Sequence, residues 1–240
     1  MLDFHHVYFY SHDSMPGIDR IVKQVTEVFP ICKMDVKEPR PLPDIEQARI
    51  SDIKQSFERQ PKEHRNFDLY GRQVALYDGF ELQRLLAREI ESSGDVVHIV
   101  STDLLACTFS EDDWRYHART FVCGTPAIIS IAGIVEAPAK PKEFYAPFAD
   151  IQSLKRKLAG RFIDYGDARI ADAAAGCTLQ ALFFFLTNGE PFCDNDYCRL
   201  FNAHWQQDLI RTQVEKPALC LKHQSLAKKF NSRLAARKRI

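Results

Sequence analysis

The sequence predicts an α/β fold in which helices pack on a twisted, mixed and mostly parallel sheet. Short runs rich in β-branched and aromatic residues alternate with segments whose apolar residues recur at helical spacing. Hydrophobic residues make up 45% and charged residues 27% of the 240 positions, as is usual for a globular protein. A chain of this length can bury a substantial core.

The N-terminal part of the chain has the pattern strand, helix, strand. Residues 6–10 (HVYFY) have the aromatic and β-branched content of a short strand. Apolar residues at helical spacing predict a helix over 18–29, and 32–38 (CKMDVKE) reads as a second strand. A polar stretch over 39–69 follows, and we expect it to form an exposed excursion.

The middle of the chain continues the alternation. Residues 79–90 (GFELQRLLAREI) predict an amphipathic helix, and the apolar run 95–102 predicts a buried strand. Residues 110–121 open with a serine in N-cap position and acidic residues, which favours a short helix or a turn. Residues 122–135 are strand-like with glycines, which predicts a hairpin or a bulged edge, and 136–147 form a proline-rich loop.

Two more helices are expected towards the C-terminus, over 150–160 and 167–187. The second ends at Asn188-Gly189, a pair typical of the left-handed turn that stops a helix. The tail over 225–240 (SLAKKFNSRLAARKRI) is basic and has a high helix propensity.

Charge and hydropathy narrow the class of protein. Thirty-two basic residues balance thirty-two acidic ones, so no net field draws the chain to nucleic acid or to a membrane surface. The longest apolar run, around 181–186, is too short to cross a bilayer. The N-terminus lacks the pattern of a secretory signal, so we expect a cytoplasmic protein with reduced cysteines.

Three of the seven cysteines and one histidine form a spaced cluster near the C-terminus. Cys193, Cys198, Cys220 and His223 give the pattern C-x4-C-x21-C-x2-H, two short-spaced pairs in loop-like sequence. Structural zinc is bound tetrahedrally by four sulfur or nitrogen ligands that commonly come in such pairs. The pattern therefore predicts one structural zinc ion, although buried cysteines beside a surface histidine would give the same spacing.

The cluster and the helix before it resemble the C-terminal signature of archaemetzincins, zinc peptidases of the metzincin clan. That family carries H-E-x-x-H-x-x-G-x-x-H-C-x4-C-x-M, followed about twenty residues later by C-x-x-C. Cys193 and Cys198 match the first cysteine pair, and Gly189 falls on the turn glycine. The second pair is matched by KPALCLKH (216–223), in which His223 replaces the last cysteine.

Weaker agreement with the family runs upstream, through the opening strand–helix–strand, GRQ (71–73), HIVSTDLL (98–105) and FVCGTPAIIS (121–130). The resemblance implies a metzincin-like fold. Its N-terminal subdomain, 1–188, would include the former active-site helix. Its C-terminal subdomain, 189–240, would be held together by the zinc ion.

The catalytic half of the signature is missing from this chain. The positions of the first histidine, the glutamate and the second histidine hold Leu182, Phe183 and Leu186. Phe192 stands at the third histidine and Leu200 at the methionine. Leu and Phe can neither bind zinc nor act as the general base on a zinc-bound water. The resemblance therefore implies a member of the family without catalytic residues, in which the former site has become hydrophobic core.

Three hypotheses about function remain open. The first is a pseudoenzyme that keeps a structural zinc ion and binds a peptide or protein partner. The second is a zinc-stabilised adaptor for nucleic acid or protein, although the balanced charge argues against nucleic acid. The third is an active hydrolase with other metal ligands, such as Asp112, Asp113 and His117. The second hypothesis would use the basic residues of the tail, which are Lys228, Lys229, Arg233, Arg237, Lys238 and Arg239.

A few other polar residues are weaker candidates for a site. His5 and His6 with His12 could form a metal cluster, but flanking positions of an N-terminal strand explain them better. His98 lies in an apolar strand and is expected to be a hydrogen-bonded core histidine. Two residues on the predicted active-site helix have no recognisable nucleophile–base partner: Cys177 and Gln180.

Overall fold

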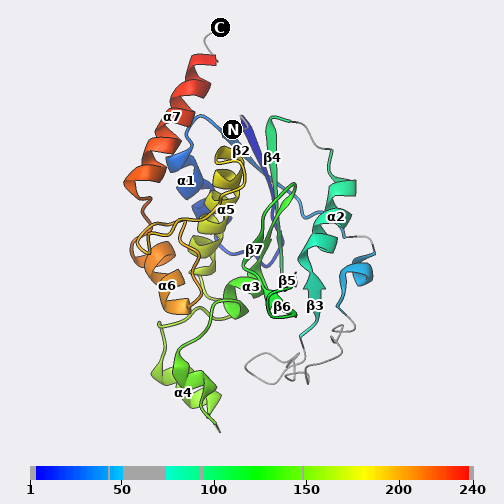
Figure 1. Ribbon diagram of the computed structural model, residues 1–240, viewed down its shortest axis with the longest axis vertical. Helices are drawn as coiled ribbons and strands as arrows, with labels where there is room; N and C mark the ends of the chain where they lie inside the picture. Colours follow the sequence, from blue (N-terminus) through cyan, green and yellow to red (C-terminus); the bar gives the residue numbers. More distant parts are fainter. Residues whose placement is uncertain (1–3, 43, 51–73, 92–93, 148, 238–240) are drawn as a thin grey trace.

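The computed structural model describes residues 4–42, 44–50, 74–91, 94–147 and 149–237 (Figure 1). Its main sheet has five strands in the order β2-β1-β4-β8-β7. The first four run parallel, and only β7 is antiparallel to its neighbour. The predicted mixed, mostly parallel sheet is therefore confirmed. Its strands are β1 (His6–Tyr10), β2 (Lys33–Lys37), β4 (Val96–Thr102), β7 (Phe121–Val122) and β8 (Ala127–Ser130).

Helices cover both faces of this sheet, as Figure 1 shows. One face carries α1 (Ile18–Val28), α5 (Ile170–Leu186) and α7 (Leu221–Arg237), and the other carries α2 (Gly79–Glu89). α1, α2 and α5 lie where helices are predicted, and α7 lies where the helix propensity of 225–240 predicts one. α7 already begins at Leu221, so the expected loop-like sequence around the second pair is wrong for His223. Seven α-helices are present in the described part of the chain.

Alternation along the strands explains this layering, because successive side chains of a strand point to opposite faces. In β1, Val7 and Phe9 join the core cluster that includes α1, α5 and α7, whereas Tyr10 joins the cluster around α2. In β4, Ile99 and Val100 divide in the same way. The inner part of the sheet is thus buried on both sides, as the apolar sequences of its inner strands require, whereas the edge strand β2 is polar and largely exposed.

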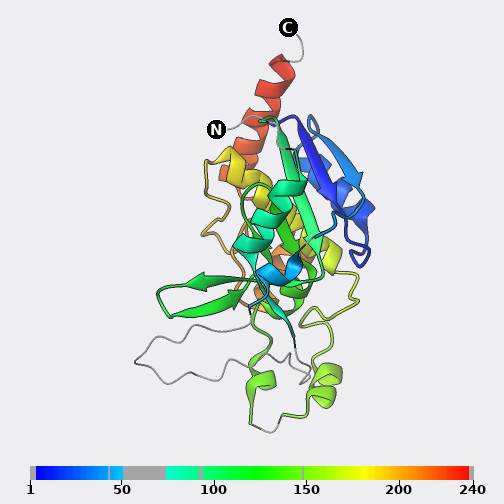
Figure 2. The same ribbon diagram turned by 90° about the vertical axis from the view of Figure 1, so that its right-hand side faces the viewer.

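A second, three-stranded sheet has the order β3-β5-β6. Its strands are β3 (Leu76–Asp78), β5 (Leu105–Ser110) and β6 (Arg115–Ala118). The hairpin of β5 and β6 projects from the body of the protein (Figure 2). A turn lies between these strands, so the turn predicted within 110–121 is present, but the alternative of a helix is wrong. The aromatic residues around the turn pack across the hairpin instead, with Phe109 and Tyr116 ring centroids 5.3 Å apart.

The segment 122–135 is only partly the hairpin that its sequence predicts. β7 and β8 pair antiparallel, but the chain then forms helix α3 (Ile131–Glu136). The Ser130 hydroxyl caps this helix by accepting a hydrogen bond from the Gly133 N–H at 2.8 Å. A Cβ atom at Gly133 would lie 1.9 Å from the Arg119 carbonyl oxygen, so this turn of helix requires glycine.

The remaining elements are short. The expected polar excursion falls mostly on 51–73, outside the described residues, as does the GRQ segment (71–73). The helix predicted over 150–160 is present as α4. The short elements are the 3₁₀ turns η1 (Ile45–Ala48) and η2 (Lys142–Tyr145), α4 (Ile151–Lys157), α6 (Gln206–Ile210) and the π-helical turn η3 (Arg211–Glu215).

Residues on both sides of Gly189 build one hydrophobic core. Leu200, Leu209 and Phe230 belong to the same buried cluster as the apolar residues of α1 and α5. The end of α5 is marked by Gly189, whose φ of 114° places it in the left-handed region, as expected for a helix stop. Within the described ranges, none of the helices combines the length and the apolar character needed to span a bilayer.

Candidate metal centre

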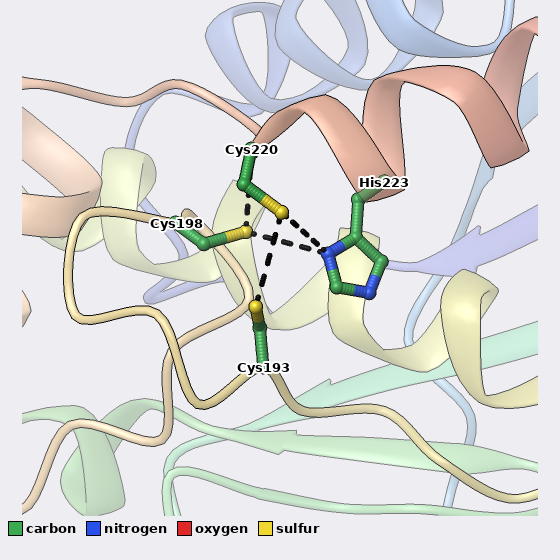
Figure 3. A group of neighbouring side chains, drawn as sticks. All are labelled: Cys193, Cys198, Cys220 and His223. Atoms are coloured by element: carbon green, nitrogen blue, oxygen red, sulfur yellow. Dashed lines mark hydrogen bonds between the residues drawn. The ribbon is translucent and has the colours of Figure 1, made fainter.

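Four side chains from two short segments meet beside the C-terminal end of α5 (Figure 3). Cys193 and Cys198 bracket the turn that follows this helix. Cys220 directly precedes α7, and His223 lies in its first turn. The structure thus brings together the four residues that the spacing predicts, although their two pairs are separated by 21 residues of sequence.

The distances between the ligand atoms fit a tetrahedral metal ion. The four atoms lie within 4.8 Å of one another. Zinc–ligand bonds of about 2.0–2.3 Å imply edges of about 3.8 Å between two sulfurs and about 3.5 Å between sulfur and nitrogen. The sulfurs of Cys193 and Cys220 are 3.9 Å apart. The Nδ1 atom of His223 lies 3.6 Å from the Cys198 sulfur and 3.2 Å from the Cys220 sulfur. The group could therefore hold a metal ion.

Backbone N–H groups support the sulfurs from outside the cluster. The Cys198 sulfur accepts hydrogen bonds from the N–H groups of Leu200 at 3.5 Å and Cys220 at 3.4 Å. The Cys193 sulfur accepts one from the N–H of Asn195 at 3.4 Å. Such bonds orient the ligands and offset part of the negative charge of thiolates.

Burial sets the protonation states of this group in the absence of a metal ion. Burial raises the pKa of the Cys198 thiol to about 12, so in the absence of a cation this sulfur keeps its proton at neutral pH. Burial also lowers the pKa of His223, with a contribution from the nearby Lys222, and so keeps the imidazole in the neutral form that binds metals. Because metal binding requires the thiolate, a cation here would displace the Cys198 proton.

The helix positions next to the cluster are filled with apolar side chains. Leu182, Phe183 and Leu186 on α5 are buried, and Leu200 is buried beside them. Phe192 differs because its side chain is 40% exposed, and its ring contacts Phe121 of β7 with centroids 5.7 Å apart. The expectation that these positions form hydrophobic core therefore holds for all of them except Phe192.

The space beside α5 is nearly filled. A cavity bordered by Thr120, Cys177 and Gln180 has a volume of about 10 Å³, which is room for about one water molecule. Burial raises the pKa of the Cys177 thiol to about 12. The Gln180 side chain donates a hydrogen bond to the Phe201 carbonyl oxygen at 3.2 Å. Neither residue has the exposure and partners of a nucleophile–base pair.

The proposed alternative ligands of the hairpin form an ion-pair group. The Nε2 atom of His117 lies 2.9 Å from the Asp113 carboxylate, which also pairs with Arg115. The hydrogen bond from His117 and the neighbouring Arg115 lower the pKa of Asp113. Asp112 does not join them in a metal-binding group. Within the residues that the structure describes, Cys193, Cys198, Cys220 and His223 make the one group of three or more potential metal ligands.

The other histidine candidates do not come together. His6 contacts the Asp35 carboxylate at 2.8 Å, and His12 contacts Asp103 at 3.4 Å. His98 is buried in β4 and its Nδ1 atom lies 3.1 Å from the Tyr10 hydroxyl. Its Nε2 atom is buried with no hydrogen-bond partner, so His98 is a core histidine that is only half satisfied. The N-terminal metal cluster is thus absent from the described residues.

The basic tail forms the end of α7, which projects from the body (Figure 1). Lys228 and Lys229 are exposed, whereas Arg233 is half-buried. Residues 238–240, which include Lys238 and Arg239, lie outside the described residues. Binding of an acidic partner or nucleic acid by this helix stays a prediction.

A buried arginine beside the cluster is the feature that sequence reasoning missed. The Arg199 side chain, 4% exposed, follows Cys198 directly in the sequence. Its guanidinium donates to Gln24 of α1, to the Asp172 carbonyl oxygen of α5 at 3.2 Å and to the Gln213 side chain at 3.3 Å. Burial lowers its pKa to about 10. These bonds connect the turn that carries Cys198 to α1 and α5. No local sequence pattern predicts them.

The fold and the site define an α/β protein with a group of three cysteines and one histidine that could bind a metal ion. A family model described as "Probable metallopeptidase family (DUF6775)" matches residues 3–230. The chain belongs to this probable metallopeptidase family, which implies a metal. No curated protein and no solved structure matches the chain.

Proposed function

We propose that this protein is a metallopeptidase-family member without peptidase chemistry, which holds one structural zinc ion and acts by binding a peptide or protein partner. The observation that carries the proposal is the burial of Leu182, Phe183 and Leu186 on α5. In the archaemetzincin signature these positions hold two zinc ligands and a general base. Here they contribute to the core and offer no ligand atom and no proton acceptor.

The donor set supports zinc as the metal. Three sulfurs and one imidazole nitrogen in tetrahedral reach of one point are ligands typical of structural zinc. A catalytic zinc has three protein ligands and keeps one position open for water or substrate. The three cysteines and His223 together offer four protein ligands and leave no such open position. When bound, the ion would cross-link the turn after α5 to the start of α7, and its binding free energy would add to that of folding.

The match to the archaemetzincin pattern rests on Gly189 and on the two cysteine pairs, the second ending in His223. Two conformational features support this match. Gly189 has a positive φ and ends the helix, and the two pairs converge. We therefore propose an archaemetzincin-like branch of the family in which the catalytic ion was lost and the structural one kept.

A peptidase assay combined with chelation tests the proposal. Purified protein should leave a mixture of unstructured peptides uncleaved, both as isolated and after zinc is added. Elemental analysis should find about one zinc per chain, as one tetrahedral site implies. Peptide cleavage that a chelator abolishes and zinc restores would overturn the proposal. So would a second equivalent of tightly held zinc.

A further inference from the structure

A cleft of about 490 Å³, well within the size range of ligand sites, opens on the surface between η2, the segment after α4 and the start of α6. It does not include the metal-ligand cluster. Two cations, one carboxylate, one amide, a proline and a tryptophan line it. These residues are Pro141, Lys142, Glu143, Arg161, Trp205 and Gln207.

Trp205 is presented to solvent from a fixed backbone. Its side chain is 36% exposed, although tryptophan is among the residues that gain most from burial. The Ala139 N–H donates to the His204 carbonyl oxygen and the Gln206 N–H donates to the Ala139 carbonyl oxygen, each at 2.8 Å. The backbone is therefore fixed on both sides of Trp205, and this fixed backbone keeps the indole partly exposed to solvent.

Buried polar groups behind the cleft reinforce this arrangement. The Gln206 side chain is fully buried, donates to the Ile134 and Val135 carbonyl oxygens at 3.0 and 3.1 Å, and accepts from the Ile163 N–H at 3.0 Å. Lys140, 1% exposed, also donates to the Val135 carbonyl oxygen, at 2.9 Å. The wall that carries Trp205 is thus preorganised, which lowers the entropic cost of binding.

The charges of the cleft favour an anionic ligand. Lys142 and Arg161 outnumber Glu143, the one acidic residue of the lining. Arg161 and Glu143 are 3.5 Å apart and both about half exposed, so their ion pair contributes little and Arg161 can exchange it for a ligand carboxylate. Glu143 in turn would repel the clustered charge of a phosphate group but can accept a hydrogen bond from a peptide N–H.

We propose that this cleft binds a peptide segment in which a carboxylate flanks a proline or another flat apolar residue. The carboxylate pairs with Arg161, the flat side chain stacks on the Trp205 indole beside Pro141, and Glu143 accepts from the peptide backbone. The choice of a peptide as the ligand rests on the proposed function, which is non-catalytic binding of a peptide or protein. Binding in this cleft needs neither the zinc ion nor the absence of peptidase activity, so the two proposals can fail separately.

Fluorescence of Trp205 tests the inference directly. The chain contains two tryptophans, and Trp114 lies in the β5–β6 turn, so full-length protein with Trp114→Phe reports on Trp205 alone. The probe is the peptide acetyl-Asp-Pro-Leu-Asp-amide, and the comparison peptide is acetyl-Lys-Pro-Leu-Lys-amide. We expect a saturable blue shift with the acidic peptide only, weakened about tenfold by Arg161→Gln, as loss of one charge-assisted hydrogen bond implies.

Arg84→Gln serves as the matched control, because Arg84 is also a partly exposed arginine, ion-paired with Glu81 on α2 and outside the cleft lining. Calorimetric titration with Trp205→Leu, a change of an exposed side chain, should show binding lost by at least about tenfold, as for a tryptophan anchor. Absence of a saturable shift up to millimolar peptide would overturn the proposal. Equal binding of the lysine peptide, equal binding by Arg161→Gln, or tighter binding of adenosine monophosphate than of the acidic peptide would do so too.

Discussion

The ring of Phe183 packs edge-on against the imidazole of His223, with ring centroids 5.3 Å apart and an interplanar angle of 88°. Phe183 also contacts Phe29, which directly follows α1, with ring centroids 5.6 Å apart, and is completely buried. The helix position that we assign to a lost glutamate therefore holds the imidazole of the metal cluster in place. In many metal sites a hydrogen-bonded polar group orients the histidine ligand, and here the contact with Phe183 orients His223 instead.

Restoring an acidic residue at this position should destabilise the protein. We expect Phe183→Glu to lower the free energy of unfolding by at least about 4 kcal/mol, because it removes a buried aromatic ring and buries an unpaired carboxylate. Phe184→Glu changes the next residue of α5, which is only half-buried, and should cost about 1 kcal/mol, as for most substitutions. Urea unfolding of both variants measures the difference. Equal losses would show that Phe183 is not part of the core.

Local patterns predicted the long helices and the convergence of the four cluster residues, but not the short helices α3 and α6. The apolar periodicity of α1 and α2 and the continuous apolar sequence of α5 predict these helices without tertiary information, and the two short-spaced pairs identify the four residues that converge. The short strands β3 and β5 were missed because their stability comes from pairing with distant segments and not from their own sequence. The same limit hides the Phe183–His223 contact and the burial of Arg199, which exist only once the segments are folded together.

Removal of the metal should lower the melting temperature. A ligand present at a thousand times its dissociation constant stabilises the native state by about 4 kcal/mol, which for a chain of this size corresponds to about 10 °C. We expect a shift of this order when EDTA is added to the zinc-loaded protein, measured by calorimetry. The Cys198→Ser variant should melt at the same temperature with and without EDTA. A wild-type melting temperature that does not change when EDTA is added would contradict a structural role for the ion.

The stability of the protein should fall on mild acidification, in part through His98. Burial, with a contribution from Arg40, lowers the pKa of His98 below its ordinary 6.5. Below about pH 6.5 the unfolded chain therefore binds a proton that the folded chain does not, so the free energy of unfolding falls as the pH falls, by up to about 1.4 kcal/mol per pH unit. The loss continues until the pH reaches the lowered pKa of the folded state.

Replacement of His98 should flatten this pH dependence. His98→Phe keeps a ring in the core and removes the titrating group, so its unfolding free energy should change less than that of the wild type between pH 7.5 and 5.5. His204→Gln, a change of an exposed histidine, should follow the wild type. Urea unfolding at the two pH values in the presence of zinc measures the effect. A wild-type slope retained by His98→Phe would rule out this histidine as a source.

The N-terminal part should not fold without the C-terminal part. A chain ending at residue 188 lacks Leu200, Leu209 and Phe230, which fill the same core cluster as α1 and α5. We expect this fragment to show no cooperative unfolding transition, whereas a chain ending at Arg237 should unfold as the full-length protein does. Cooperative unfolding of the shorter fragment would show instead that residues 1–188 form an independent domain.

The metal content of three purified proteins tests the central proposal most directly. Elemental analysis should find about one zinc per chain in the wild type and in Cys123→Ser, which changes a half-buried cysteine outside the cluster, as one tetrahedral site implies. In Cys198→Ser the zinc content should fall close to zero after dialysis. Wild-type protein without zinc, or a Cys198→Ser variant that retains the same amount as the wild type, would contradict a structural zinc site formed by Cys193, Cys198, Cys220 and His223.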